Sequence, residues 1–74
     1  MNRFSDLDLP WYIKDDLRDL EKKYPGIFDK TPEELDKIAS NFYWEAENAY
    51  AEANRIESQG DYLRAYLKAI GYKK

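Results

Sequence analysis

The longest stretch without proline or glycine, residues 33–59, is the strongest constraint on the fold of this chain. Thr31, followed at once by a proline and three residues later by Glu34, forms the capping-box pattern of a helix start. Glycine commonly follows the last turn of a helix, and Gly60 stands at the end of the stretch. The sequence therefore predicts one long central helix over residues 32–58, about 40 Å long at 1.5 Å per residue.

Two shorter helices are expected on either side of the central one. The first spans about residues 10–24 and stops at Pro25-Gly26, because the residue before a proline resists the α conformation. The other spans about residues 61–72, with Asp61 in the cap position. Apolar side chains at helical spacing mark both segments. They are Ile13, Leu17, Leu20 and Tyr24 in the first, and Leu63, Leu67 and Ile70 in the other.

The composition favours helix throughout, since valine is absent and Thr31 is the only threonine. We expect an all-α, three-helix architecture with a short first helix, one long central helix and a short C-terminal helix. It forms a single domain over residues 10–74, preceded by an N-terminal arm of residues 1–9. The arm is too short to stand alone, so it must dock on the core or on a partner.

A chain of 74 residues has room for only one core. It contains no cysteine and no histidine, which excludes disulfides and metal binding by thiolate or imidazole. Small domains without these supports depend on tight helix packing or on association with another subunit. We therefore expect a protein partner, and a homodimer is one form that the association could take.

The central segment carries apolar residues that alternate by four and three over three heptads, the spacing of a packed helix seam. Four of the seven are alanine, which allows a neighbouring backbone to approach closely. A helix of about 40 Å is too long for either short helix to cover alone. Part of its surface is thus expected to remain available for binding. The seam consists of Leu35, Ala39, Phe42, Ala46, Ala49, Ala53 and Ile56.

Consecutive aromatic residues at positions 42–44 indicate where such a surface lies. Three neighbours on a helix point about 100° apart, so they cannot all face one core. We expect Phe42 inside and either Tyr43 or Trp44 outside, forming a patch with Tyr50; the alternative is that these rings cap the ends of the bundle. The predicted partner-binding residues are Trp11, Tyr43, Trp44, Glu45, Glu47, Tyr50 and Glu52.

Most chemical functions lack their usual residues. Without histidine the common general base is missing, and no glycine-rich phosphate loop or calcium loop occurs. We expect no enzyme activity, no cofactor and no small-molecule substrate. No segment approaches the roughly 20 apolar residues of a membrane span, and the chain start lacks a signal-peptide pattern. The expected location is the cytoplasm, away from membranes.

The charges are unevenly distributed along this small acidic protein. Residues 31–57 hold seven acidic and two basic residues, a net charge of −5, whereas residues 62–74 hold four basic residues and no acidic ones. Four bases are a weak patch for nucleic acid, which makes nucleic-acid binding an unfavoured function. The acidic segment instead suggests an alternative: a DNA-mimicking inhibitor of the phage or mobile-element type that occupies a basic protein site.

Residues 58–66, with the sequence SQGDYLRAY, resemble the inter-helix turn of a tetratricopeptide hairpin. The resemblance covers part of the second half of the chain, and it implies a peptide-binding helical hairpin. Upstream the sequence departs from the family pattern, because Ala49 and Glu52 occupy positions of bulky apolar residues. No second repeat follows. The function expected from the sequence is a small non-catalytic interaction module that binds and modulates a protein partner, self-associating through the long helix.

Overall fold

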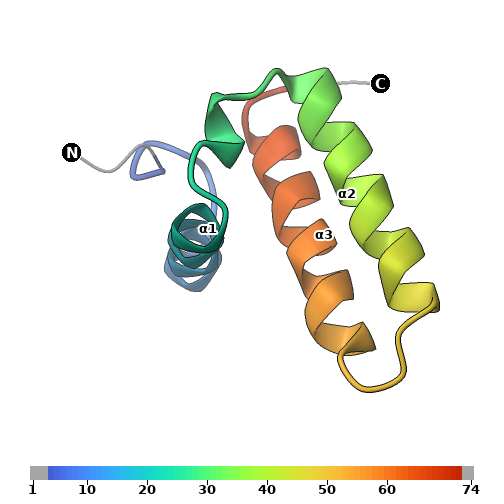
Figure 1. Cartoon of the computed structure of the whole chain (residues 1–74). Coiled ribbons are helices and arrows are strands. Elements are labelled where there is room, and N and C mark those ends of the chain that lie inside the picture. The colour runs from blue at the N-terminus through green and yellow to red at the C-terminus, as the bar shows by residue number, and fades with distance from the viewer. Residues whose placement is uncertain (1–3, 73–74) are drawn as a thin grey trace.

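The computed structural model describes residues 4–72, and its secondary structure within them is entirely helical. The elements are α1 (Trp11–Lys23), the 3₁₀ helix η1 (Ile27–Asp29), α2 (Pro32–Glu47) and α3 (Ala53–Ala69). Figure 1 shows α2 and α3 side by side as an antiparallel hairpin, with α1 beside them and viewed along its axis. The predicted all-α, three-helix architecture is confirmed.

The start of α2 follows the predicted cap. The backbone N–H of Glu34 donates a hydrogen bond of 3.2 Å to the Thr31 hydroxyl oxygen, which satisfies one of the N–H groups left over at a helix start. The Thr31 hydroxyl in turn donates to Glu34 Oε1 at 3.1 Å. The sequence pattern therefore located this boundary correctly.

The prediction of one long central helix is wrong, because α2 ends at Glu47 and residues 48–52 turn the chain back. The side chain of Asn48 donates a hydrogen bond of 2.9 Å to the carbonyl oxygen of Trp44. The backbone N–H of Asn48 donates a second one, of 3.1 Å, to the carbonyl oxygen of Glu45. The asparagine side chain thus takes the carbonyl oxygen that the backbone N–H of the same residue would bond in a continuing helix. The central and third helices are thus nearly equal, with 16 and 17 residues.

The predicted seam divides at this turn. Its first four members, all on α2, are buried: Leu35, Ala39, Phe42 and Ala46. The remaining three, Ala49, Ala53 and Ile56, are only partly buried. Phe42 faces inward as predicted, and the hairpin packs the two halves of the segment against each other instead of leaving a rod.

Gly60 does not end a helix but lies within α3, so the third helix begins at Ala53 and not at the predicted residue 61. A Cβ atom on Gly60 would stand 3.1 Å from Tyr43 Cζ and 3.3 Å from the carbonyl oxygen of Ala39. Glycine therefore lets α2 and α3 approach closely at this level. Residues 58–66 form continuous helix, and the inter-helix turn implied by the tetratricopeptide resemblance is absent from them.

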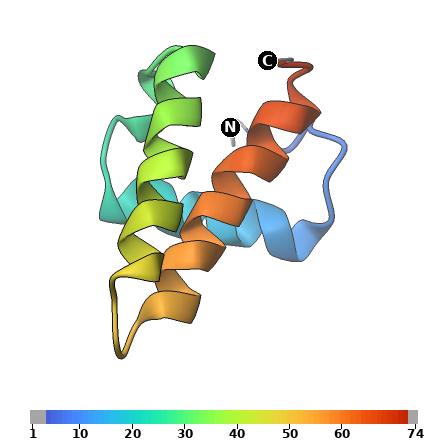
Figure 2. The same ribbon diagram turned by 90° about the vertical axis from the view of Figure 1, so that its right-hand side faces the viewer.

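The first helix crosses the hairpin and packs mainly against α3, as Figure 2 shows. Leu17 and Leu20 are buried in the core, and Ile13 packs against it, so the predicted stripe is largely correct. Tyr24 closes the stripe but remains partly exposed.

The described part of the N-terminal arm docks on the core. Phe4 is fully buried and contacts Phe28 and Tyr66 edge to face, with ring centroids 4.9 and 5.9 Å apart. Phe28 and Ile27 are themselves buried in η1 and close one end of the core. Residues 1–3 of the arm, and Lys73 and Lys74 of the predicted basic segment, lie outside the described residues.

Candidate functional site

Five of the seven predicted partner-binding residues gather at one end of the hairpin, which we call the hairpin tip (residues 44–52). It comprises the last turn of α2 and the loop to α3, at the lower end of the hairpin in Figure 1. Trp44 is 66% exposed and Tyr50 is fully exposed. Three carboxylates and no basic residue belong to the tip, giving it a charge of −3. The predicted residues that it brings together are Trp44, Glu45, Glu47, Tyr50 and Glu52.

Tyr43 lies against α3 and outside the exposed patch. Its hydroxyl donates a hydrogen bond of 2.5 Å to Asp61 Oδ1, and the guanidinium carbon of Arg64 lies 5.5 Å from the ring centroid. Burial, the hydrogen bond and the charge of Asp61 raise the pKa of Tyr43 to about 12, although Arg64 acts in the opposite direction. Of the two candidate rings, Trp44 is therefore the exposed one.

Arg64 links three polar side chains across the hairpin. Its guanidinium donates to Asp36 Oδ1 at 2.9 Å and to Ser40 Oγ at 3.2 Å, in addition to its position over the Tyr43 ring. Asp36 is almost fully buried, so the charge of Arg64 compensates much of the cost of burying a carboxylate. This network joins α2 to α3 in the half of the hairpin away from the tip.

Trp11 is separate from the tip. It is 74% exposed and begins α1, where its ring contacts Tyr12 edge to face at a centroid distance of 5.9 Å. Figure 2 shows that α1 crosses behind the hairpin, with its first turn well away from the loop between α2 and α3. Trp11 and the tip therefore do not form one continuous surface.

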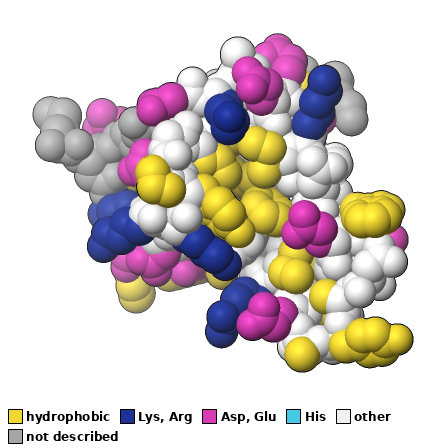
Figure 3. All heavy atoms as spheres, in the orientation of Figure 1, with side chains coloured by type: hydrophobic (Ala, Val, Ile, Leu, Met, Phe, Trp, Pro, Cys, Tyr) yellow, Lys and Arg dark blue, Asp and Glu magenta, His cyan; other side chains and the backbone are white. Residues whose placement is uncertain are grey.

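An apolar groove of about 310 Å³ lies between the end of α1 and α2. Tyr24 and Phe42 stand together in it, with ring centroids 5.9 Å apart. Figure 3 shows apolar side chains gathered between α1 and the hairpin, and others exposed near the hairpin's lower end. The remaining lining residues are Pro25, Ile27, Lys30, Ile38, Asn41 and Glu45.

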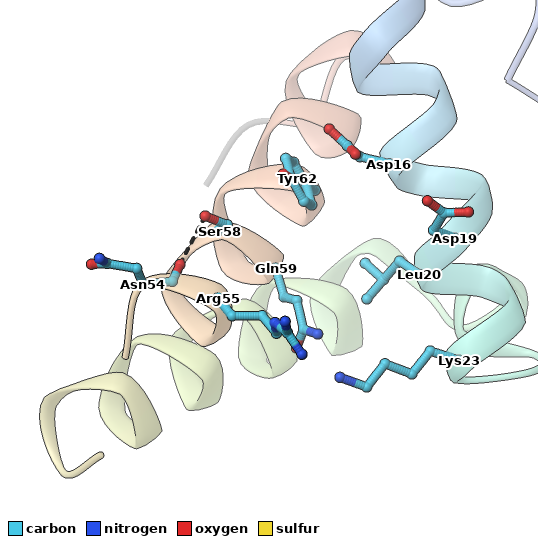
Figure 4. Close-up of a pocket in the computed structure, with 9 residues that line it drawn as sticks. All are labelled: Asp16, Asp19, Leu20, Lys23, Asn54, Arg55, Ser58, Gln59 and Tyr62. Atoms are coloured by element: carbon cyan, nitrogen blue, oxygen red, sulfur yellow. Dashed lines mark hydrogen bonds between the residues drawn. The ribbon is translucent and has the colours of Figure 1, made fainter. Parts of the chain in front are cut away.

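A larger and more polar groove of about 650 Å³ separates α1 from the first half of α3. Figure 4 shows Lys23 reaching from α1 toward Arg55 and Gln59 of α3, with Leu20 beside them. Sequence reasoning missed this groove, because its two walls are more than 30 residues apart in the chain and no local pattern joins them. The other lining residues are Asp16, Asp19, Asn54, Ser58 and Tyr62.

Within residues 4–72, no helix is both long and apolar enough to cross a membrane. In the same part of the chain, no three acidic side chains stand together as a metal site would require. Comparison with protein-family models, curated proteins and solved structures gave no match. The assignment of the hairpin tip as the candidate site therefore depends on its geometry and chemistry alone.

Proposed function

We propose that this chain is a small non-catalytic interaction module that binds and modulates a protein partner through its hairpin tip. The observation that carries the proposal is the exposure of Trp44 and Tyr50 at the same end of the hairpin. Tryptophan and tyrosine are the residues most enriched among the energetically dominant positions of protein interfaces. A partner that covers both rings would remove a large apolar area from water.

The charge of the tip indicates the chemistry of the partner. Glu45, Glu47 and Glu52 share the tip with the two rings, are exposed like them and give the tip a net charge of −3, with no basic residue in it. Complementary charges speed association and exclude partners of the same sign. The expected partner surface therefore combines an apolar depression for the rings with a basic rim.

Hydrogen bonds tie the first part of the tip to the end of α2. Asn48 ties the start of the loop to the last turn of α2 through its bond to the Trp44 carbonyl oxygen, and Arg64 joins the two helices farther along the hairpin. A surface that is ordered in advance loses less conformational entropy on binding. This supports a binding role for the tip.

Affinity capture from cells that produce this protein tests the proposal. Wild-type protein is compared with the double variant Trp44→Ala/Tyr50→Ala, and Trp11→Ala serves as a control with a similarly exposed tryptophan away from the tip. We expect a protein that is retained by the wild type and by Trp11→Ala and lost with the double variant. Equal retention by all three would refute a role for the tip.

Self-association is one form of partner binding. Two tips carry like charges and would repel each other, whereas the apolar groove between α1 and α2 offers a surface that a second copy could cover. We propose this groove as the dimer surface. Sedimentation equilibrium should detect a dimer that is lost in Asn41→Arg, which places a bulky charge at an exposed position of the groove. A wild-type chain that stays monomeric at millimolar concentration would rule it out.

The alternative proposal is an acidic nucleic-acid mimic that occupies the basic site of a nucleic-acid-binding protein. Its supporting observation is the three exposed carboxylates of the tip. The turn at residues 48–52 divides the acidic segment, and Asp36 is engaged with Arg64, so the acidic surface is shorter than a continuous rod. Binding that fails to weaken between about 50 and 300 mM salt would exclude mimicry.

A further inference from the structure

The groove between α1 and α3 carries two cationic side chains at one end. Figure 4 shows Lys23 of α1 and Arg55 of α3 extending toward each other across the opening. Neither is held by a short ion pair within residues 4–72. Lys23 Nζ stands 5.5 Å from the centroid of the Tyr24 ring, and Arg55 Nη1 is 3.8 Å from Glu52 Oε1 in a pair exposed to water. Both cations are therefore available to a ligand in the groove.

Gln59 adds a buried polar group at the same place. Its side chain is only 8% exposed, and its amide points into the groove between Lys23 and Arg55 in Figure 4. Within residues 4–72 this amide makes no hydrogen bond to another side chain or to the backbone, and its N and O atoms are not enclosed but open to the groove. Water in the groove can satisfy these atoms, and a polar group of a ligand can replace that water. Three side chains able to donate hydrogen bonds thus converge on one unfilled volume.

The start of α3 adds partial positive charge to the same end of the groove. Its N-cap residue is Glu52, whose side chain makes no capping hydrogen bond, and the first turn itself contains no acidic residue. The N–H groups at a helix start carry a partial positive charge, which favours an anion nearby. Asn54 and Arg55, both in this turn, line the groove.

The acidic lining residues of the groove, Asp16 and Asp19, both belong to α1. Asp16 lies beside Tyr62, and burial together with this carboxylate raises the pKa of the Tyr62 hydroxyl. Asp19 lies one helical turn before Lys23, between Asp16 and Lys23 along α1. The two acidic and two basic lining residues make the groove neutral in sum, and its two cations, Lys23 and Arg55, both lie beside Gln59.

We propose that Lys23, Arg55 and Gln59 form an oxyanion-binding site for a small ligand that carries a phosphate or carboxylate group. Two cations and an amide can donate several charge-assisted hydrogen bonds to one such group. The groove, about 650 Å³, is larger than the anion itself, so the anion is one end of a larger molecule whose remainder lies along Leu20 and Tyr62. This site is separate from the hairpin tip and does not depend on the function proposed for it.

The test is a titration of the full-length ¹⁵N-labelled protein with inorganic phosphate at constant ionic strength, followed by NMR. We expect saturable shifts of the Gln59 side-chain amide and of the backbone amides at Asn54 and Arg55, with half-saturation on the order of 10 mM or lower, as befits a ligand of few atoms. A second titration with acetate at the same ionic strength distinguishes a phosphate group of the ligand from a carboxylate group. Saturable shifts with acetate alone assign a carboxylate, and those with phosphate alone assign a phosphate group.

Three variants complete the test. Arg55→Gln should weaken binding about tenfold or more, and Gln59→Leu, which keeps the shape of the buried side chain, about threefold or more. Lys37→Gln removes one positive charge from an exposed position on α2 and should leave binding unchanged. Shifts that stay linear to high phosphate concentration, or equal weakening by Lys37→Gln, would overturn the proposal. An unchanged amide spectrum away from the groove shows that each variant is folded.

Discussion

Gly60 of α3 lies directly against the ring of Tyr43 of α2. A Cβ atom on Gly60 would stand 3.1 Å from Tyr43 Cζ and 3.2 Å from Tyr43 Cε1, closer than the ordinary carbon–carbon contact of about 3.5 to 4.0 Å. A glycine inside a helix costs about 1 kcal/mol relative to alanine. The close contact between the helices explains why glycine occupies this position despite that cost.

Gly60→Ala should therefore lower the free energy of unfolding by about 1 kcal/mol, against the gain expected from helix propensity alone. The added methyl group must displace either the Tyr43 ring or the backbone of Ala39. Urea denaturation measures the change. In a Tyr43→Ala background the same substitution should cost less, because the ring is gone. A Gly60→Ala variant that is more stable than wild type would show that the contact imposes no constraint.

Replacing Arg64 by methionine should destabilise the protein by about 1 to 3 kcal/mol. The carboxylate of Asp36 is nearly buried and would lose the cation that compensates it, whereas Arg64 itself is partly exposed, which limits the loss. Arg18→Met is the matched control, since Arg18 pairs with Asp15 on the surface of α1. That variant should change stability by less than about 0.5 kcal/mol. Equal effects of the two substitutions would contradict the role of the Arg64 network.

Stability at high pH should depend on Tyr43. Burial and Asp61 raise its pKa to about 12 from an ordinary value of 10.0, so the unfolded chain loses this proton first. The stability that the protonated Tyr43 hydroxyl adds to the folded state is fully present below pH 10 and is lost as the pH rises toward 12. The free energy of unfolding should thus fall over this window, and less steeply in Tyr43→Phe. The remaining slope includes Tyr62, whose pKa is also raised. Tyr50→Phe, a change on an exposed ring, should keep the wild-type slope.

Removing the anchor of the N-terminal arm should be costly. Phe4 is fully buried between Phe28 and Tyr66, so Phe4→Ala should destabilise the domain by about 3 to 5 kcal/mol. That is a large part of the stability of a domain this small. Trp44→Ala, at an exposed ring, should change stability little by comparison. A mild effect of Phe4→Ala in thermal unfolding would mean that the arm is not part of the core.

Local patterns in the sequence predicted local structure well. The cap at Thr31, the stop before Pro25 and the inward position of Phe42 each depend on residues close in the chain, and each is confirmed. The break at residues 48–52 was missed because it contains neither proline nor glycine. Asn48 was its only local signal, and one asparagine is compatible with a continuous helix.

The remaining features depend on contacts between distant residues. Gly60 has the same sequence signature whether it ends a helix or makes room for a neighbouring ring, and only the position of Tyr43 decides between them. The bonds of Arg64 to Asp36 and Ser40 join residues 28 and 24 positions apart. Composition predicted that some rings would be exposed. The hairpin determined that Trp44 and Tyr50 are exposed at the same end.

A photo-crosslinking experiment tests the central claim most directly. The photoreactive amino acid p-benzoylphenylalanine replaces Tyr50 at the hairpin tip in one variant and Tyr12, an exposed tyrosine on α1, in the other, in cells that produce this protein. We predict a discrete adduct of higher mass, which mass spectrometry identifies as a single protein, from position 50 and none from position 12. Equal adducts from both positions, or none from position 50, would contradict the assignment of the tip as the partner-binding surface.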